Sequence, residues 1–270
     1  MIAKIERKNA LDDIANIVRE CYGVMVARGD LALEMSFEDV PIAQKRIITV
    51  CRDEGVPVIT ATQMLESMIS FHKPTRAEAA DIANAILDGS DAVMLSAESA
   101  VGRFPVEAVS TMATIAARAE KSWITGELPI PPSIPDRTDL EAAVAHAAHA
   151  IANSVTAKAI IAATASGSTP RRVACHRPKM PILALCSTKE VCRRLALSWG
   201  VRPILYEPVV GTAHLVRLSV DAATKVLGAK PEDVLTIVAG TPYNMPGKTN
   251  LIKVEKISDA LKAIHSEIGE

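Results

Sequence analysis

Short apolar runs and amphipathic segments alternate along the first half of the chain. The apolar runs read as strands buried on both faces of a sheet and cover residues 1–5, 23–27, 57–61 and 92–96. Apolar positions at helical spacing predict helices over residues 11–19, 40–53, 75–87 and 105–120. Strand–helix units in series predict parallel strands joined by right-handed crossovers.

Helix starts in this half carry local signals. Thr75 and Glu78 stand three positions apart directly after Pro74, which is typical of a capping box. Pro105 suits the first turn of a helix, where its missing N–H costs nothing.

The second half repeats the alternation. An apolar stripe predicts a helix over residues 140–155, with Thr138 and Glu141 as its capping box. Ser187 and Glu190 indicate another helix start, and residues 215–227 a further helix. Predicted strands cover residues 159–163, 181–185, 203–206, 234–238 and 250–254. Both halves therefore belong to the α/β class.

A proline-rich segment separates the halves. It contains Pro129, Pro131, Pro132 and Pro135, and proline both fixes its own φ and restricts the residue before it. We expect a first domain over residues 1–121, a linker over 122–137 and a second domain over 138–270.

Composition narrows the function class. With 30 Lys+Arg against 31 Asp+Glu the net charge is −1, so nothing favours a nucleic-acid or anionic-membrane partner. No apolar run approaches the roughly 20 residues that span a bilayer, and no secretory signal precedes the first strand. The five cysteines form no C-x-x-C pair, which favours reduced thiols in a cytoplasmic protein.

Charged and hydroxyl residues follow the predicted strands of the first half: Lys4 and Glu6, Arg28 to Asp30, Thr62 and Gln63, and Ser96 and Glu98. The C-terminal ends of parallel strands share one face, where active sites form. Carboxylates such as Glu6 and Asp30 suit Mg²⁺ or Mn²⁺, and a lysine can stabilise negative charge on a transferred group. Taken singly, each residue also fits an ordinary solvent-exposed strand end.

These residues belong to longer strings that closely resemble pyruvate kinases, in order and spacing, over almost the whole chain. The strings are A-K-I-E (3–6), V-A-R-G-D-L (26–31), A-T-Q-M-L-E-S-M (61–68), P-T-R-A-E (74–78), M-L-S-A-E (94–98) and G-T-P-Y-N-M-P-G-K-T-N (240–250). Ala32, Ala97 and Ser99 depart from frequent family residues in a way that resembles the bacterial branch.

The resemblance implies phosphoryl transfer from phosphoenolpyruvate to ADP, giving pyruvate and ATP in glycolysis. By position, Lys4 matches the lysine that stabilises the phosphoryl group in transit, and Glu6 and Asp30 match the ligands of Mg²⁺ or Mn²⁺. The amides of Gly29 and Asp30 and the hydroxyl of Thr62 match the groups that hold the substrate carboxylate. Thr62, or a water linked to it, is also implied in protonating the enolate.

A second candidate site follows the first strand of the second half. Thr164, Ser166, Gly167, Ser168 and Thr169 lead into a helix, an arrangement that can hold a phosphate. The loop resembles the one at which pyruvate kinases bind phosphorylated allosteric effectors. A simple strand-to-helix turn with capping hydroxyls is the alternative. His146 and His149 nearby are interpreted as a solvated face or a domain contact, not a metal site.

A complete (β/α)₈ barrel needs eight strands and about 250 residues, more than residues 1–121 supply. The resemblance therefore predicts the C-terminal half of a TIM barrel followed by an α/β regulatory domain with a mostly parallel sheet. The family's lid domain and potassium site fall outside the matched strings, so a potassium requirement stays open.

We expect another polypeptide, a second copy or a longer gene product to complete the barrel, and no activity from this chain alone. The family forms tetramers, so a homo-oligomer is expected. A catalytically silent metabolite-sensing module or an assembly module derived from the family remains the alternative.

Overall fold

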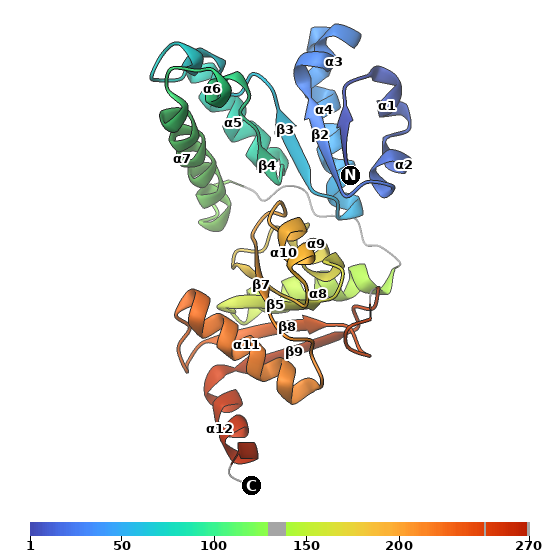
Figure 1. Ribbon diagram of the computed structural model, residues 1–270, viewed down its shortest axis with the longest axis vertical. Coiled ribbons are helices and arrows are strands. Elements are labelled where there is room, and N and C mark those ends of the chain that lie inside the picture. Colours follow the sequence, from blue (N-terminus) through green and yellow to red (C-terminus); the bar gives the residue numbers. More distant parts are fainter. Residues whose placement is uncertain (129–138, 246, 269–270) are drawn as a thin grey trace. The chain divides into compact units, whose positions relative to one another are not determined.

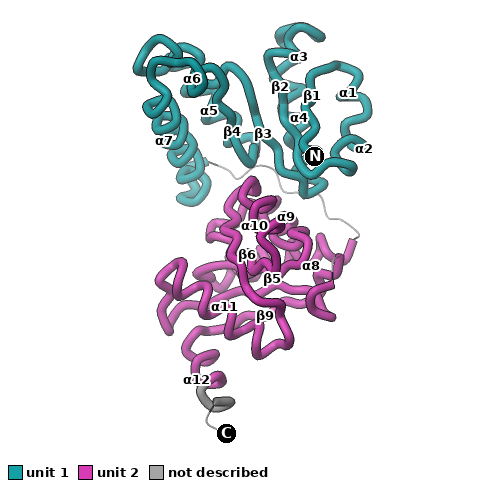
Figure 2. The backbone as a smooth tube through the Cα atoms, in the orientation of Figure 1, with its two compact units in different colours: residues 1–133 teal, residues 134–270 magenta. Residues whose placement is uncertain are grey.

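The computed structural model describes residues 1–128, 139–245 and 247–268. The chain divides into two compact units, Met1–Ser133 and Ile134–Glu270 (Figure 2). Each unit is described by itself.

Unit 1 contains a parallel sheet with strand order β1-β2-β3-β4 (Figure 1). Its strands are β1 (Ile2–Ile5), β2 (Gly23–Ala27), β3 (Val58–Ala61) and β4 (Ala92–Val93). Every neighbouring pair is parallel, as the sequence predicts. The described strands form an open sheet in strand order, which agrees with part of a barrel.

Helices connect and follow these strands. They are α1 (Lys8–Asp12), α2 (Ile14–Arg19), α3 (Arg28–Glu34), η1 (Phe37–Asp39), α4 (Val40–Glu54), η2 (Glu66–Ile69), α5 (Arg76–Asp88), α6 (Ala97–Ala100) and α7 (Pro105–Ile124). One core cluster packs the sheet against α4 through residues such as Val24, Val58 and Ile47. A second cluster packs α5 against α7 and includes Ile82 and Met112.

The helix-start predictions for unit 1 are confirmed. Thr75 Oγ1 accepts from the Glu78 amide at 3.2 Å, and the Glu78 carboxylate accepts from the Thr75 amide at 2.7 Å. Pro105 is the first residue of α7. The N-cap residue and the first-turn proline thus fix where α5 and α7 begin.

Several predicted boundaries are wrong. The single helix predicted over residues 11–19 is two helices that meet at Asp13, which has the non-helical dihedrals φ −111° and ψ 20°. Strand β4 ends at Val93, three residues earlier than predicted. Helix α7 continues to Ile124, so residues 122–124 are helical although the sequence places them in the linker. Residues 129–137 of that predicted linker, and residue 138 after it, lie outside the described residues.

Unit 2 contains a sheet with strand order β7-β6-β5-β8-β9. Its strands are β5 (Ala159–Thr164), β6 (Ile182–Cys186), β7 (Val201–Leu205), β8 (Val234–Ala239) and β9 (Leu251–Lys256). Only the β8–β9 pair among them is antiparallel, so the mostly parallel sheet is confirmed.

The helices of unit 2 are α8 (Leu140–Ser154), α9 (Ser168–Ala174), α10 (Lys189–Leu195), α11 (Thr212–Leu227) and α12 (Ile257–Ile268). Helices α11 and α12 share one core cluster with the sheet, and α8, α9 and α10 share another (Figure 1). Each face of the sheet is therefore buried under helices, which explains its continuous apolar strands.

Two helix starts in unit 2 differ from the prediction. The residue that caps α8 is Asp139, whose carboxylate accepts from the Ala142 amide at 2.8 Å; Thr138 lies outside the described residues. The residue that caps α10 is Thr188, one position after the predicted Ser187, and its hydroxyl accepts from the Val191 amide at 3.3 Å. Thr188 has the extended backbone that an N-cap requires.

All five cysteines are free thiols. Among the described residues, no helix combines the length and apolar character that crossing a bilayer requires.

Candidate functional site

Three charged side chains meet at the C-terminal end of β1 and the start of α3. Lys4 Nζ lies 2.7 Å from Glu6 Oε2 and 2.7 Å from Asp30 Oδ2. Because β1 pairs directly with β2, the residues that follow these two strands share one edge of the sheet. Hydrogen bonds that the Lys4 ammonium donates to Asp30 and then to Glu6 raise the pKa of Lys4, so its ammonium form is favoured. About half of each side chain is exposed, which leaves the group accessible.

This trio can bind a cation and an anion side by side. Glu6 and Asp30 converge on one positive charge, and carboxylate oxygens are the ligands that Mg²⁺ and Mn²⁺ prefer. The donor set fits such an ion in part. Among the described residues no group of three or more His, Cys, Asp or Glu is suited to a metal. Further oxygen ligands would come from substrate or water, as is usual for Mg²⁺.

Thr62 and Gly29 also meet at this edge of the sheet. Thr62 directly follows β3 and has φ 69°, and the next residue, Gln63, has φ 54°. The Thr62 hydroxyl accepts from the Gly29 amide at 2.9 Å and donates to the Ala61 carbonyl at 2.6 Å. The two residues are close enough that a Cβ added to Gly29 would lie 3.6 Å from Thr62 Oγ1, an ordinary van der Waals distance.

The remaining polar residues of this edge connect loops. Glu98 is buried, and its carboxylate accepts from the Leu65 amide at 3.1 Å and the Ser96 amide at 2.7 Å. It thus joins the loops that follow β3 and β4. The sequence groups Ser96 and Glu98 with the candidate site, whereas their contacts here are with backbone.

The sequence does not predict a role for Arg28. Its guanidinium donates to the backbone carbonyls of Ala61 and Thr62 and pairs with Asp81. The sequence signal is an arginine that directly follows a buried strand. Its partner Asp81 stands 53 positions away, so spacing does not reveal the pair.

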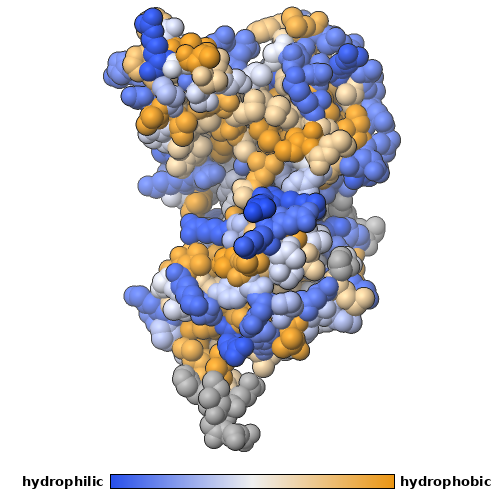
Figure 3. All heavy atoms as spheres, viewed as in Figure 1, coloured by the Kyte–Doolittle hydropathy of each residue, from blue (hydrophilic) through white to orange (hydrophobic). Residues whose placement is uncertain are grey.

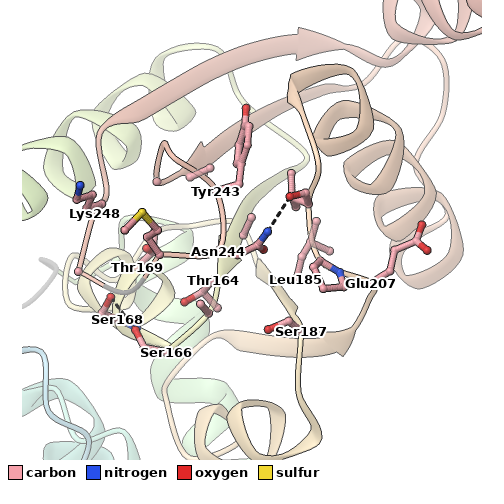
Figure 4. Close-up of a pocket in the computed structure, with 18 residues that line it drawn as sticks. Thr164, Ser166, Ser168, Thr169, Leu185, Ser187, Glu207, Tyr243, Asn244 and Lys248 are labelled. Carbon is pink, nitrogen blue, oxygen red and sulfur yellow. Dashed lines mark hydrogen bonds between the residues drawn. The ribbon is translucent and has the colours of Figure 1, made fainter.

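Unit 2 contains a pocket that is partly open to solvent (Figure 4). The loop after β5 contributes Thr164, Ser166, Ser168 and Thr169 to its lining. The loop between β8 and β9 contributes Tyr243, Asn244 and Lys248. The pocket is thus built from strand ends and loops of one unit.

Hydrogen bonds within the loop after β5, and one to the β8–β9 loop, fix its conformation. Gly167 has φ 91°, and its amide donates to Thr164 Oγ1 at 2.8 Å. The hydroxyls of Thr169 and Thr249 lie 2.7 Å apart and join this loop to the β8–β9 loop across 80 positions of sequence. Four of the five predicted effector-loop residues line the pocket, and Gly167 supplies the turn between them.

Lys248 is a lining residue that the sequence reading left without a role. It adds a positive charge to the lining of the pocket, and in Figure 4 it lies on the same side as Thr169 and Ser168. Glu207 also lines the pocket, but its carboxylate points away from the hydroxyls and contacts His214 at 3.0 Å and Arg217 at 3.7 Å. The lining near the hydroxyls therefore suits an anion.

The histidines of α8 contact a third histidine. The His146 and His149 rings lie 5.1 Å and 5.6 Å from the ring of His176, measured between centroids. Burial, followed by the neighbouring His146, lowers the pKa of His149. The cluster is a packing contact between α8 and the end of α9.

Comparison with known proteins gives one consistent result. Residues 1–109 match the family model described as pyruvate kinase, barrel domain, and residues 142–255 match pyruvate kinase, alpha/beta domain. Pyruvate kinase 2 of Synechocystis is 46% identical over 263 residues, covering 97% of this chain and 44% of the relative. A pyruvate kinase of Clostridium acetobutylicum is 43% identical over 257 residues, covering 95% and 54%.

A solved structure is also similar. The crystal structure of a pyruvate kinase from Cryptosporidium parvum has a TM-score of 0.83 and 36% identity, covering 95% of this chain and 51% of the other. The chain spans about half the length of the curated relatives described above.

Proposed function

The chain belongs to the pyruvate kinase family, and on that premise we propose that unit 1 contributes to phosphoryl transfer from phosphoenolpyruvate to ADP. The products are pyruvate and ATP. The observation that supports this proposal most strongly is the convergence of Lys4, Glu6 and Asp30 beside the Gly29–Thr62 contact.

Each residue has a role that its chemistry allows. Glu6 and Asp30 would hold Mg²⁺ or Mn²⁺, which when bound neutralises charge on substrate oxygens. Lys4 would stabilise the negative charge on the phosphoryl group as it leaves the substrate and reaches ADP. Its raised pKa keeps it positive for this purpose.

Substrate orientation falls to the second pair of residues. The amides of Gly29 and Asp30 and the Thr62 hydroxyl would hold the substrate carboxylate. After phosphoryl transfer the enolate must gain one proton on carbon to become pyruvate. The Thr62 hydroxyl, or a water hydrogen-bonded to it, would supply that proton.

The test is a coupled assay of pyruvate formation from phosphoenolpyruvate, ADP and Mg²⁺. It uses the purified chain alone and the chain mixed with the N-terminal part of the Synechocystis relative. We expect Lys4→Met to lower turnover about 100- to 1,000-fold, since it removes one charge that stabilises the transition state. Lys73→Met, an exposed lysine of the same unit, is the matched control. Turnover that survives Lys4→Met would remove the lysine from the mechanism.

We propose a second function for unit 2, the binding of a phosphorylated effector in the pocket beside Thr164. The hydroxyls of the loop after β5 and the charge of Lys248 support it. Because this function needs no completed active site, it also fits the alternative of a catalytically silent sensing module. The coupled assay separates the two alternatives.

Effector binding is measured by isothermal titration with a sugar monophosphate and with a nucleoside monophosphate. We expect Ser168→Asp to weaken binding at least tenfold, because it places a negative charge beside the phosphate. Ser154→Asp adds the same charge at an exposed position of α8, outside the pocket, and should leave binding unchanged. Equal affinities of the two variants would count against the pocket.

We also propose that the protein works in the cytoplasm as a homo-oligomer. The family membership supports this, as do the free cysteines. K⁺ is a possible further cofactor whose site lies outside the matched strings, and omission of K⁺ from the coupled assay tests whether activity requires it.

A further inference from the structure

The turn that carries Thr62 has an unusual backbone. Thr62 and Gln63 both lie in the left-handed region, with φ 69° and φ 54°. Residues with a side chain rarely adopt this conformation, and two in succession persist only where surrounding contacts hold them. The contacts that hold this turn are therefore part of what orients Thr62.

Arg28 supplies those contacts. Its Nε donates to the Ala61 carbonyl at 3.2 Å, and its Nη2 donates to the Thr62 carbonyl at 2.6 Å. Nη2 also lies 2.8 Å from the Met64 sulfur, so the guanidinium reaches from the end of β3 past the turn. The Arg28 side chain is only 12% exposed.

Asp81 on α5 holds the guanidinium from the other side. Its carboxylate lies 2.7 Å from Arg28 Nη1. A planar guanidinium has several donors in fixed directions, so one anchored edge sets the direction of the others. A lysine has a single point of charge and cannot hold two carbonyls and a carboxylate in this way.

The consequence reaches the Thr62 hydroxyl. With the Ala61 and Thr62 carbonyls fixed, Thr62 Oγ1 faces the Gly29 amide at 2.9 Å. Gly29 is the residue after Arg28, so the same segment orients both members of the pair. The guanidinium donates to the Ala61 and Thr62 carbonyls, to the Met64 sulfur, to Asp81 and, at 3.5 Å, to Gln44 Oε1.

We propose that Arg28, anchored by Asp81, is a positioning residue that holds the Thr62 turn and sets the direction of its hydroxyl. The importance of that direction for catalysis rests on the proposed function of Thr62. The competing interpretation is that Arg28 only ties α5 to the sheet and that the turn keeps its shape without it.

The first test is amide hydrogen exchange on the full chain and needs no activity. In Arg28→Met the Gly29 amide should exchange at least tenfold faster, because its acceptor is no longer held in place. Arg28→Lys should give a partial effect, and Asp81→Asn a smaller one in the same direction. Arg19→Met, an exposed arginine of unit 1 that pairs with Glu54, is the matched control and should change nothing at Gly29.

Amides in the interior of β2 report on global stability in the same spectra. Faster exchange at Gly29 with unchanged exchange in β2 supports the proposal. Unchanged Gly29 exchange in Arg28→Met would overturn it. If Arg28→Met unfolds, Arg28→Lys and Asp81→Asn decide the matter by the same criterion.

The second test is a double-mutant cycle with Thr62→Ala in the coupled assay. Each single variant should lower kcat about 100-fold, as loss of a proton donor does, and should also raise KM, because the same hydroxyl helps to hold the substrate carboxylate. If Arg28 acts through Thr62, the double variant should be within about threefold of Thr62→Ala alone. Multiplicative losses would leave Arg28 with only a structural role. Absence of turnover in the unmodified chain even after mixing with the N-terminal part of the Synechocystis relative would refute the proposed function, and the exchange experiment would then decide the role of Arg28.

Discussion

At the scale of single residues, the Glu78 carboxylate of unit 1 accepts four hydrogen bonds. The donors are the amides of Ser67 and Thr75, each at 2.7 Å, and both of their hydroxyls. Burial on its own would raise the pKa of Glu78, but these bonds outweigh it and lower the pKa. One residue thus caps α5 and fixes the η2 segment.

This network predicts a pH dependence of stability. A carboxylate whose pKa is lower in the folded than in the unfolded chain stabilises the fold above the unfolded value, about 4.3. That contribution is lost as pH falls through the folded pKa. Glu78→Gln should cost about 1 kcal/mol at pH 7 and should flatten the fall in stability below pH 5.

Urea unfolding of unit 1 between pH 3 and 7 measures this effect. Glu66→Gln, a neighbouring glutamate for which no such bonds to Ser67 and Thr75 are seen, is the control and should follow the unmodified protein. Parallel pH curves for Glu78→Gln and the unmodified protein would contradict the assignment.

The candidate sites could be predicted from the sequence only in part. Lys4, Glu6, Gly29, Asp30 and Thr62 stand near the ends of adjacent parallel strands, so sequence order alone brings them to one edge. No role for Arg28 or Lys248 could be predicted from the sequence, because the role of each depends on which groups it contacts in the fold. Arg28 contacts a turn with a left-handed backbone. The residues of that turn, Thr62 and Gln63, are not types that predict this conformation.

At the scale of elements, the strands follow from their apolar runs, while helix ends depend on single bonds. The pattern predicts α10 but places its cap at Ser187, because Ser187 and Thr188 are both acceptable caps and only backbone dihedrals choose between them. The predicted helix over residues 11–19 breaks at Asp13 although its apolar spacing continues. Periodicity therefore identifies an element more securely than its limits.

The contact between α8 and α9 predicts a second pH effect. Burial and the nearby His146 lower the pKa of His149, so His149 gains a proton less readily in the fold than in the unfolded chain. Its contribution to stability is complete above the unfolded pKa, about 6.5, and is lost as pH falls from there toward the folded pKa.

NMR titration of the imidazole protons checks this directly. In His146→Ala, the pKa of His149 should rise toward 6.5, because one of its two causes is removed. A His149 pKa that does not move would show that burial acts alone.

At the scale of the whole molecule, the two units have separate cores, and unit 1 carries large apolar side chains at its surface. Figure 3 shows hydrophobic residues among hydrophilic ones on the viewed face of unit 1. Leu33 is 87% exposed, Phe37 83% and Ile42 66%, and all three lie within one short stretch of sequence. Contiguous exposed apolar patches are typical of surfaces that become buried in an assembly, and these three side chains are the candidates for one.

If these apolar side chains form an interface, the full chain should self-associate. Light scattering coupled to size exclusion should give a mass above the 28.7 kDa of one chain. Replacing Leu33, Phe37 and Ile42 together by serine should shift the population toward the monomer, while the same change at Val210, an exposed valine of unit 2, should not. A monomeric unmodified protein at micromolar concentration would refute the proposal of a homo-oligomer.

The hydrogen bond between Gly29 and Thr62 has a consequence for how a carboxylate ligand would enter. Without ligand, the Gly29 amide already donates to Thr62 Oγ1 at 2.9 Å, so the hydroxyl occupies the place of a ligand oxygen. Binding is then an exchange of one acceptor for another, and the hydroxyl that gives way becomes free to turn toward the newcomer. Breaking this one hydrogen bond therefore frees the Gly29 amide to donate to the ligand and the Thr62 hydroxyl to contact it.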